Sequence, residues 1–198
     1  MKFSEFANRL DELTRPEKMS DVDQILSNAG YYRVGKGEFG EVFRKEGRSD
    51  VLKIFKTKDR AYKDFVLYCK SNPNRWLPVF KGNILRVNDD YNAIRMEILK
   101  PIDKDVGSDD RMKHGSMRHY LWRLKDPSLW QDDDNDEIIE FVKRNEDLKN
   151  TLEDIADIAI SNGYILDLHK ENIMKRGNQL VIADPLAVHV DYIPHTIF

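Results

Sequence analysis

The spacing of hydrophobic and polar residues divides the chain into stretches with different periods. Over residues 1–30 apolar side chains recur every three or four positions, which predicts a helical leader with one apolar stripe (Phe3, Phe6, Ala7, Leu10 and Leu13). Pro16 interrupts that stripe. A second short helix is predicted to follow, capped by Asp21 and ended by Gly30.

From residue 31 the pattern changes to short segments rich in aromatic and β-branched residues. Residues 31–34, 41–45 and 51–55 predict a three-stranded antiparallel meander, because glycine-containing turns separate them. Residues 61–70 predict a helix on that sheet, and residues 79–87 and 93–99 predict two further strands around a polar turn. This half of the chain therefore reads as a five-stranded sheet with one helix.

From residue 100 onward the helical period dominates. Residues 108–125 and 136–163 predict helices, the second ended by Gly163, and residues 165–182 return to short strand-like pieces. The fold class predicted is α+β, with a sheet-rich lobe before a helix-rich lobe and a hinge near Lys100 and Pro101. We expect a leader over residues 1–30, an N-lobe over 31–100 and a C-lobe over 101–198.

Composition excludes several classes of protein. The chain has 198 residues and 34% charged residues, but 32 basic against 35 acidic side chains leave a net charge of −3, which argues against a dedicated nucleic-acid binder. No apolar run approaches the roughly 18 residues that span a bilayer. The single cysteine, Cys69, cannot form an internal disulfide. These features predict a cytoplasmic protein.

A glycine-rich segment is the strongest local motif. Gly35, Gly37 and Gly40 form a G-x-G-x-x-G pattern, and the residues after it resemble a strand, so we predict a hairpin turn rather than a dinucleotide-binding turn. Glycines in such a turn let backbone N–H groups approach a phosphate. An ordinary glycine-rich turn is the alternative.

Lys53 lies in the middle of an otherwise apolar strand, Val51 to Phe55. Burial of an ammonium group there is costly unless the group meets an anion, and a phosphate under the glycine loop is a suitable one. The alternative is an edge strand with Lys53 pointing to water.

A third cluster of polar residues lies far downstream. Asp167, Asn172 and Asp184 follow short apolar segments, with a hairpin around Gly177 between the last two. A carboxamide and a carboxylate can hold Mg²⁺, and the remaining carboxylate can orient a hydroxyl. Taken singly, each is a common turn or cap residue.

In this order the motifs resemble those of the protein-kinase-like fold over residues 31–187. The chain is most similar to the early serine/threonine protein kinases of short-tailed lytic bacteriophages. The closer match rests on three stretches: Ala29-Gly30-Tyr31, residues 61–69 with Leu77-Pro78-Val79, and residues 167–174 with Asp184-Pro185. The resemblance implies a bilobal fold with a truncated helical C-lobe. It also implies transfer of the ATP γ-phosphate to Ser or Thr of host proteins in the host cytoplasm, with autophosphorylation.

The resemblance assigns roles to individual residues. Lys53 would bind the α- and β-phosphates beneath the loop, and the backbones of Glu97 and Leu99 would meet adenine, with Met96 as gatekeeper. The loop residues implied are Gly35, Gly37, Phe39, Gly40 and Val42.

Four downstream residues complete this set. Asp167 would be the catalytic base and His169 would touch the γ-phosphate. Asn172 and Asp184 would hold Mg²⁺, with Mn²⁺ as an alternative ion.

The sequence also departs from ordinary kinases. Ile165-Leu166 stands in place of His-Arg before the aspartate, and Pro185-Leu186 in place of Phe-Gly after Asp184. No glutamate occurs between residues 47 and 96, so Asp64, or second Asp59, is the expected partner of Lys53. The helices that hold a peptide substrate do not fit after Asp184, so the leader and residues 108–149, or self-association, would replace them.

Two other functions remain open: a small-molecule phosphotransferase of the antibiotic-kinase type, and a catalytically inactive nucleotide-binding module that inhibits a host protein. Asp132, Asp134 and Asp136 lack the glycine and glutamate of a calcium loop and predict a solvated acidic loop. In residues 108–123 we expect a solvated helix face, with His114 and His119 at the surface and Trp122 buried.

Overall fold

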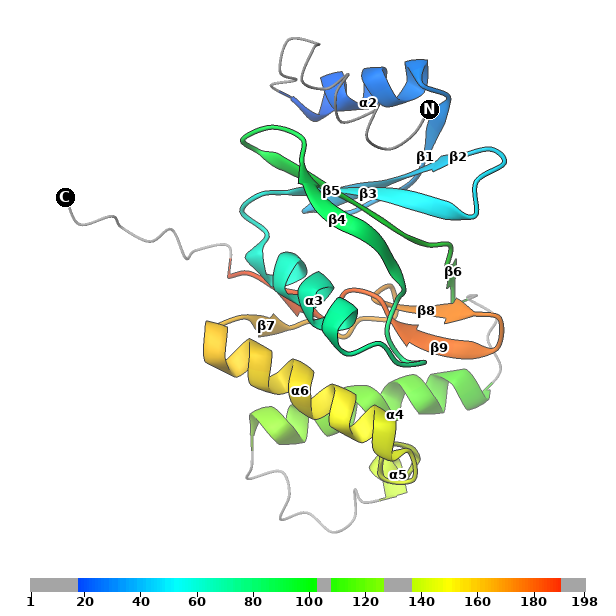
Figure 1. The fold of residues 1–198 in the computed structure, drawn as a ribbon. Helices are drawn as coiled ribbons and strands as arrows, with labels where there is room; N and C mark the ends of the chain where they lie inside the picture. Colours follow the sequence, from blue (N-terminus) through cyan, green and yellow to red (C-terminus); the bar gives the residue numbers. More distant parts are fainter. Residues whose placement is uncertain (1–17, 103–107, 127–136, 190–198) are drawn as a thin grey trace, which may run out of the picture. The chain divides into compact units, whose positions relative to one another are not determined.

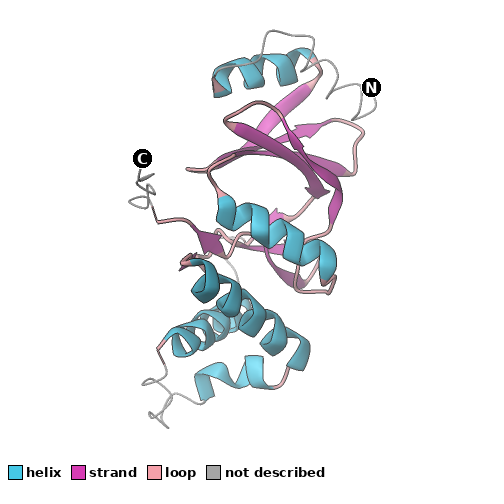
Figure 2. Ribbon diagram, turned by 60° about the vertical axis from the view of Figure 1, so that its left-hand side comes forward, coloured by secondary structure: helices cyan, strands magenta, loops and turns pink. Residues whose placement is uncertain are grey.

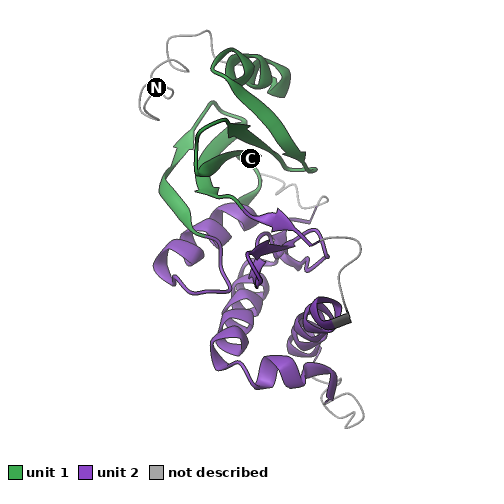
Figure 3. Cartoon of the chain, turned by 90° about the vertical axis from the view of Figure 1, so that its right-hand side faces the viewer, with its two compact units in different colours: residues 1–60, 79–98 green, residues 61–78, 99–198 purple. Residues whose placement is uncertain are grey.

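The computed structural model describes residues 18–102, 108–126 and 137–189. These residues form two compact units (Figure 3). Unit 1 takes its residues from 1–60 and 79–98, and unit 2 from 61–78 and 99–198. The apolar stripe of residues 3–13 and the acidic loop of residues 132–136 lie outside the described residues. None of the helices in the described ranges has the length and apolar character needed to cross a membrane.

Unit 1 contains a five-stranded antiparallel sheet, as predicted (Figures 1 and 2). The strand order is β1-β2-β3-β5-β4, so β3 is the central strand. The strands are β1 (Tyr31–Lys36), β2 (Gly40–Lys45), β3 (Asp50–Lys56), β4 (Phe80–Arg86) and β5 (Tyr91–Glu97).

The helix α2 (Met19–Asn28) covers one face of this sheet. Its Val22 and Leu26 are fully buried in a core cluster with side chains of the sheet (Phe43, Leu52, Ile54, Val87 and Ala93). Asp21 lies in the first turn, not before it: its Oδ2 accepts a hydrogen bond of 3.2 Å from the backbone N–H of Lys18. The predicted helix is thus confirmed, while its N-cap position belongs to Lys18.

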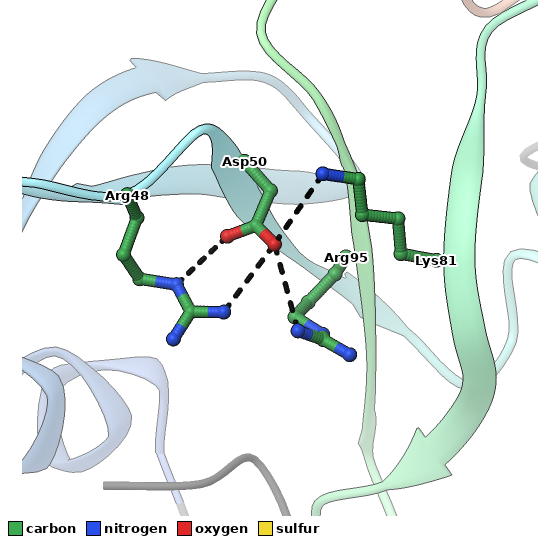
Figure 4. A network of polar contacts seen from close by, with 4 residues as sticks. All are labelled: Arg48, Asp50, Lys81 and Arg95. Carbon is green, nitrogen blue, oxygen red and sulfur yellow. Dashed lines mark hydrogen bonds and ion pairs between the residues drawn. The ribbon is translucent and has the colours of Figure 1, made fainter.

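One carboxylate in this unit is surrounded by three cations (Figure 4). Asp50, at the start of β3, has a side chain that is 8% exposed. Arg48 donates to both of its oxygens, at 2.8 Å and 3.3 Å, and Arg95 and Lys81 approach at 3.5 Å and 3.8 Å. The hydrogen bond from Arg48 is the main cause that lowers the pKa of Asp50, against the opposing effect of burial.

We expect Asp50→Asn to lower the free energy of unfolding by about 1 to 3 kcal/mol at pH 7, because the cations lose their buried anion. A carboxyl whose pKa is lower in the folded state stabilises the fold above its unfolded pKa, near 3.9, and this contribution is lost as the pH falls through the folded pKa. Chemical denaturation at pH 7 and at pH 3 measures the difference. The matched control is Asp89→Asn, whose pair with Arg86 is exposed and worth under about 1 kcal/mol. An equal cost of Asp50→Asn at both pH values would contradict the assignment.

Unit 2 combines helices with three short strand pairings (Figure 1). In α4 and α6, Tyr120 Oη donates to Glu153 Oε1 at 2.7 Å, which ties the two helices together. The strand β7 pairs with β10, and β8 pairs with β6 and β9. The elements are α3 (Arg60–Ser71), β6 (Lys100–Pro101), α4 (Ser108–Lys125), a 3-10 turn (Glu137–Ile139), α5 (Glu140–Lys143), α6 (Glu146–Asn162), β7 (Ile165–Leu166), β8 (Ile173–Arg176), β9 (Gln179–Ile182) and β10 (Leu186–Ala187).

The helix predicted over residues 136–163 is interrupted. Asn145 leaves the helical conformation, with φ −119° and ψ 87°, and separates α5 from α6. Its Nδ2 donates to the carbonyl of Phe141 at 2.7 Å, so the side chain satisfies an acceptor at the end of α5. Gly163 ends α6 in the left-handed conformation, as predicted.

Residues 61–78, with most of α3, belong to unit 2, whereas the sequence pattern grouped them with the sheet. Three side-chain hydrogen bonds hold them there: Tyr68 Oη to Asp154 Oδ2 (2.8 Å), Tyr164 Oη to Asp64 Oδ2 (2.7 Å) and Asn74 Nδ2 to Thr151 Oγ1 (3.0 Å). Cys69 is buried in this helix, and burial raises the pKa of its thiol, so it behaves as a core residue.

Candidate active site

The glycine loop of unit 1 is a hairpin turn between β1 and β2. The N–H of Gly37 donates to the carbonyl of Gly40 at 2.8 Å, which closes the turn, and Gly35 is paired with Val42 across the two strands. The carbonyl of Phe39, at the tip, accepts from the N–H of Lys56 at 2.8 Å. The loop therefore rests on β3.

The three glycines of the motif have different reasons to be glycine. A Cβ on Gly40 would lie 2.6 Å from the backbone carbonyl oxygen of Ile54, so the approach of β2 to β3 itself requires glycine. A Cβ on Gly35 or Gly37 would lie no closer than 3.6 Å to its neighbours, which is ordinary contact. Sheet packing thus explains Gly40, while the space around Gly35 and Gly37 does not by itself require glycine.

Lys53 lies on the central strand of the sheet, which excludes the edge-strand alternative. It is paired with Val42 on β2 and Ile94 on β5, and it is half-buried among apolar neighbours on β3. Because Val42 follows the glycine loop, the loop and Lys53 are attached to adjacent strands of one unit. The binding of phosphate by Lys53 stays a prediction.

The residues predicted to meet adenine lie at the end of β5. The N–H of Glu97 donates to the carbonyl of Val79 at 2.9 Å, and Glu97 Oε1 accepts from the N–H of Val79 at 2.8 Å. Since its N–H is engaged, an adenine contact at Glu97 would use its carbonyl. Met96 is buried, and Leu99 begins the next part of unit 2.

In unit 2, the segment Asp167 to His169 forms a polar loop after β7. Leu168 is 5% exposed and anchors the segment, so Asp167 and His169 project away from the core. Asp167 Oδ1 lies 2.5 Å from His169 Nε2, and the side chain of Asp167 is 29% exposed. The carboxylate is therefore accessible and oriented by the imidazole.

Asn172 holds the same carboxylate from the other side. Its Nδ2 donates to Asp167 Oδ2 at 3.1 Å and to the backbone carbonyl of Asp167 at 2.7 Å, and its N–H donates to the carbonyl of His169 at 3.0 Å. The five-residue spacing seen in the sequence thus closes a loop in which Asp167, His169 and Asn172 contact one another.

Asp184 is brought to this loop by its two chain neighbours. The N–H of Ala183 donates to the carbonyl of Asn172 at 2.8 Å, and the carbonyl of Pro185 accepts from the N–H of Asp167 at 2.7 Å. Asp184 stands between these two bonds, so the backbone ties it to both Asn172 and Asp167.

This arrangement fits a hard divalent cation. The described residues contain no group of three or more His, Cys, Asp or Glu side chains that could hold a metal by themselves. Asn172 and Asp184 offer oxygen ligands, and Mg²⁺ in proteins typically takes one or two carboxylates and fills its remaining positions with phosphate and water oxygens. Asn172 and Asp184 are residue types that hold Mg²⁺ together with phosphate oxygens, and their metal-binding role stays a prediction.

One face of α4 lies against this loop, which sequence reasoning missed. His114, expected at the surface, is half-buried: its Nε2 donates to the carbonyl of Leu168 at 3.1 Å, and burial is the main cause that lowers its pKa. Trp122, expected to be buried, is 48% exposed, while Arg123 beside it is fully buried. His114, Arg118 and Trp122 follow a four-residue spacing, which places them on one helix face and was the available signal.

The predicted site residues form two groups. The glycine loop, Val42, Lys53 and Glu97 belong to unit 1. Asp167, His169, Asn172, Asp184 and Leu99 belong to unit 2. Asp64, expected to pair with Lys53, accepts from Tyr164 within unit 2, so that pairing stays a prediction.

Comparison with known proteins gives a distant likeness to solved structures alone. No family model and no curated protein matches the chain. Similar structures include the kinase PK-1 of Cydia pomonella granulovirus (12% identity, TM-score 0.39), Rad53 1-466 in complex with AMP-PNP (16%, 0.40) and the aminoglycoside phosphotransferase APH(4)-Ia (13%, 0.42). Each covers 84% of this chain, which spans 58%, 42% and 71% of theirs respectively. Likeness at this level assigns no function, so the residues themselves must support one.

Proposed function

We propose that this protein is an ATP- and Mg²⁺-dependent protein kinase that transfers the γ-phosphate to Ser or Thr hydroxyls of other proteins. The observation that carries the proposal is the clamp on Asp167, whose two carboxylate oxygens contact His169 and Asn172 while Asp184 is tied to the same loop. The resemblance to phage kinases suggests host proteins as acceptors, with autophosphorylation as a side reaction.

In the proposed reaction, Asp167 accepts the proton of the acceptor hydroxyl. The hydroxyl oxygen forms a bond to the γ-phosphorus, the bond from that phosphorus to the β–γ bridging oxygen breaks, and ADP leaves. Lys53 and the glycine loop would hold the phosphates, and His169 would donate to a γ-phosphate oxygen. Mg²⁺ held by Asn172 and Asp184 would neutralise charge on the phosphate oxygens. Positioning and charge neutralisation account for most of the catalysis in such transfers.

A small-molecule phosphotransferase is the second candidate, because antibiotic kinases also have a histidine two residues after the catalytic aspartate, and His169 contacts Asp167. ATP consumption in the presence of aminoglycosides or nucleosides, compared with a protein lysate, separates the two functions. Consumption with the small molecules alone would replace the proposed acceptor class.

The proposal is tested by transfer of radiolabelled γ-phosphate from ATP to the protein and to a bacterial lysate. We expect label on proteins with Mg²⁺, none with excess EDTA, and recovery when Mg²⁺ or Mn²⁺ is restored. Asp184→Asn is expected to raise the Mg²⁺ concentration for half-maximal labelling by about tenfold or more, since even outer-shell partners of a metal act on that scale.

The contrary outcome is equally specific. If ATP raises the melting temperature but no acceptor is labelled, the chain is a nucleotide-binding module and not a kinase. Labelling that persists in EDTA would remove Asn172 and Asp184 from their proposed role.

A further inference from the structure

Helix α4 belongs to residues 108–149, one of the expected replacements for the missing substrate platform, and it lies beside Asp167. Its His114 holds the carbonyl of Leu168, and four and eight residues later Arg118 and Trp122 reach the same loop. A pocket of about 110 Å³ lies there, wholly within unit 2. It is lined by Arg118, Leu121, Trp122, Leu166, Asp167, Leu168 and His169.

The size of the pocket favours an acceptor that inserts one side chain over an acceptor that is wholly enclosed. Whole small-molecule ligands occupy sites of roughly 300–1,000 Å³. The pocket beside Asp167, at about 110 Å³, is smaller than these sites. It therefore suits one amino-acid side chain, with the rest of the acceptor outside, better than an enclosed antibiotic.

The side chains around the pocket favour an anion next to the reacting hydroxyl. Asp167 is the one acid among the lining residues, and Arg118 is a permanent cation. Burial is the main cause that lowers the pKa of His114, and its hydrogen bond to Leu168 opposes this effect. Electrostatic interactions with Arg118 and His169 lower the pKa further. In the proposed function Asp167 binds the hydroxyl of the acceptor. Arg118 can then bind a negatively charged group of the same acceptor.

Arg118 is also pre-organised for a carboxylate. Its guanidinium carbon lies 4.6 Å from the centre of the Trp122 ring, and Trp122 is 48% exposed although it is a large apolar side chain. The ring holds the guanidinium by a cation–π contact, and the planar N–H groups of a guanidinium match the two oxygens of a carboxylate.

We propose that the acceptor is a Ser or Thr flanked by an acidic residue, whose carboxylate binds Arg118 over Trp122 while the hydroxyl reaches Asp167. This inference rests on the proposed kinase function and names its substrate class. The acidic residue next to the Ser or Thr takes no part in the chemistry and stays a carboxylate during the reaction. The only bonds that form or break are those of the phosphate transfer.

The test compares three serine peptides that differ only in the flanking residues, which are Asp and Glu, Lys and Arg, or Ala and Gln. Wild-type protein is expected to favour the acidic peptide in kcat/KM by roughly tenfold or more, the scale of a hydrogen-bonded charge pair. Arg118→Ala should remove this preference and Arg118→Glu should reverse it toward the basic peptide. Arg111→Ala, at an exposed arginine of the same helix, is the matched control and should keep it.

Binding separates failure of this inference from failure of the proposed function. Fluorescence of Trp122, assigned with Trp122→Phe, is expected to change when the acidic peptide binds to wild type and not when it is added to Arg118→Ala. If no phosphate is transferred but this signal is present, the acceptor site stands and the kinase proposal falls. If phosphate is transferred with no acidic preference, or Arg118→Ala behaves like Arg111→Ala, the acceptor site is overturned and the kinase proposal stands.

Discussion

Replacement of Asp167 by Asn is expected to lower kcat for phosphate transfer by about 10²–10⁴-fold, the range of a lost general base. The amide has the size of the carboxylate and can accept a hydrogen bond from Asn172, but it cannot take the proton of the acceptor. It also loses the contact between the carboxylate and His169. Because Asp167 lies on an accessible loop, we expect the melting temperature to change little. Single-turnover transfer with saturating Mg²⁺-ATP measures the chemical step.

The matched control is Asp157→Asn, the same change at an exposed position of α6. It should leave both rate and stability near those of wild type. Transfer by Asp167→Asn at a rate within a factor of ten of the control would show that another group takes the proton, and the proposed role of Asp167 would be wrong.

Gly40→Ala is expected to cause the largest loss of stability from a single methyl group. The new Cβ would lie 2.6 Å from the carbonyl oxygen of Ile54 and 3.2 Å from Phe55 Cβ, so β2 and β3 must move apart. Such overpacking costs about 1 to 3 kcal/mol, and occasionally more, because the backbone cannot rotate away as a side chain can. At roughly 2–4 °C per kcal/mol for a chain of this size, the melting temperature should fall by about 2–12 °C.

Gly115→Ala, the same substitution in α4, should raise the stability of the fold. Gly115 lies inside α4, and a Cβ there meets nothing within 4 Å, so alanine adds helix propensity of about 0.5–1 kcal/mol without a clash. Circular dichroism melts of both variants measure the two shifts. A drop for Gly115→Ala as large as that for Gly40→Ala would mean that the sheet contact is not the cause.

Much of the local structure could be predicted because it depends on short-range patterns. The short segments rich in aromatic and β-branched residues became β1 to β5, and the helix predicted over residues 108–125 spans Ser108–Lys125. Gly177 forms the predicted turn between β8 and β9 with φ +61°. The strand period, the helix period and the turn residues depend on neighbours in the chain. They can therefore be predicted without knowledge of the tertiary packing.

The break at Asn145 and the orientation of α4 were not predictable in the same way. The apolar content of residues 108–125 is mixed with charges all round the helix, so the pattern does not say which side faces the core. Tertiary contacts decide it: Met117 and Leu121 are buried with Arg123, and Trp122 is turned outward. Burial of an arginine and exposure of a tryptophan reverse the usual preferences, which is why residue type misled.

The α+β class, the order of the five strands along the chain, and the spacing of Asp167, Asn172 and Asp184 can be read from the sequence. Three features appear only in the folded chain: β3 with Lys53 is central, residues 61–78 join the helical unit, and the backbones of Ala183 and Pro185 bind Asp184 to the loop of Asp167. The difference lies in the distance along the chain over which the interactions act. Periodicity reflects each residue's neighbours in the chain, whereas hydrogen bonds and burial between residues far apart in the chain exist only after it has folded.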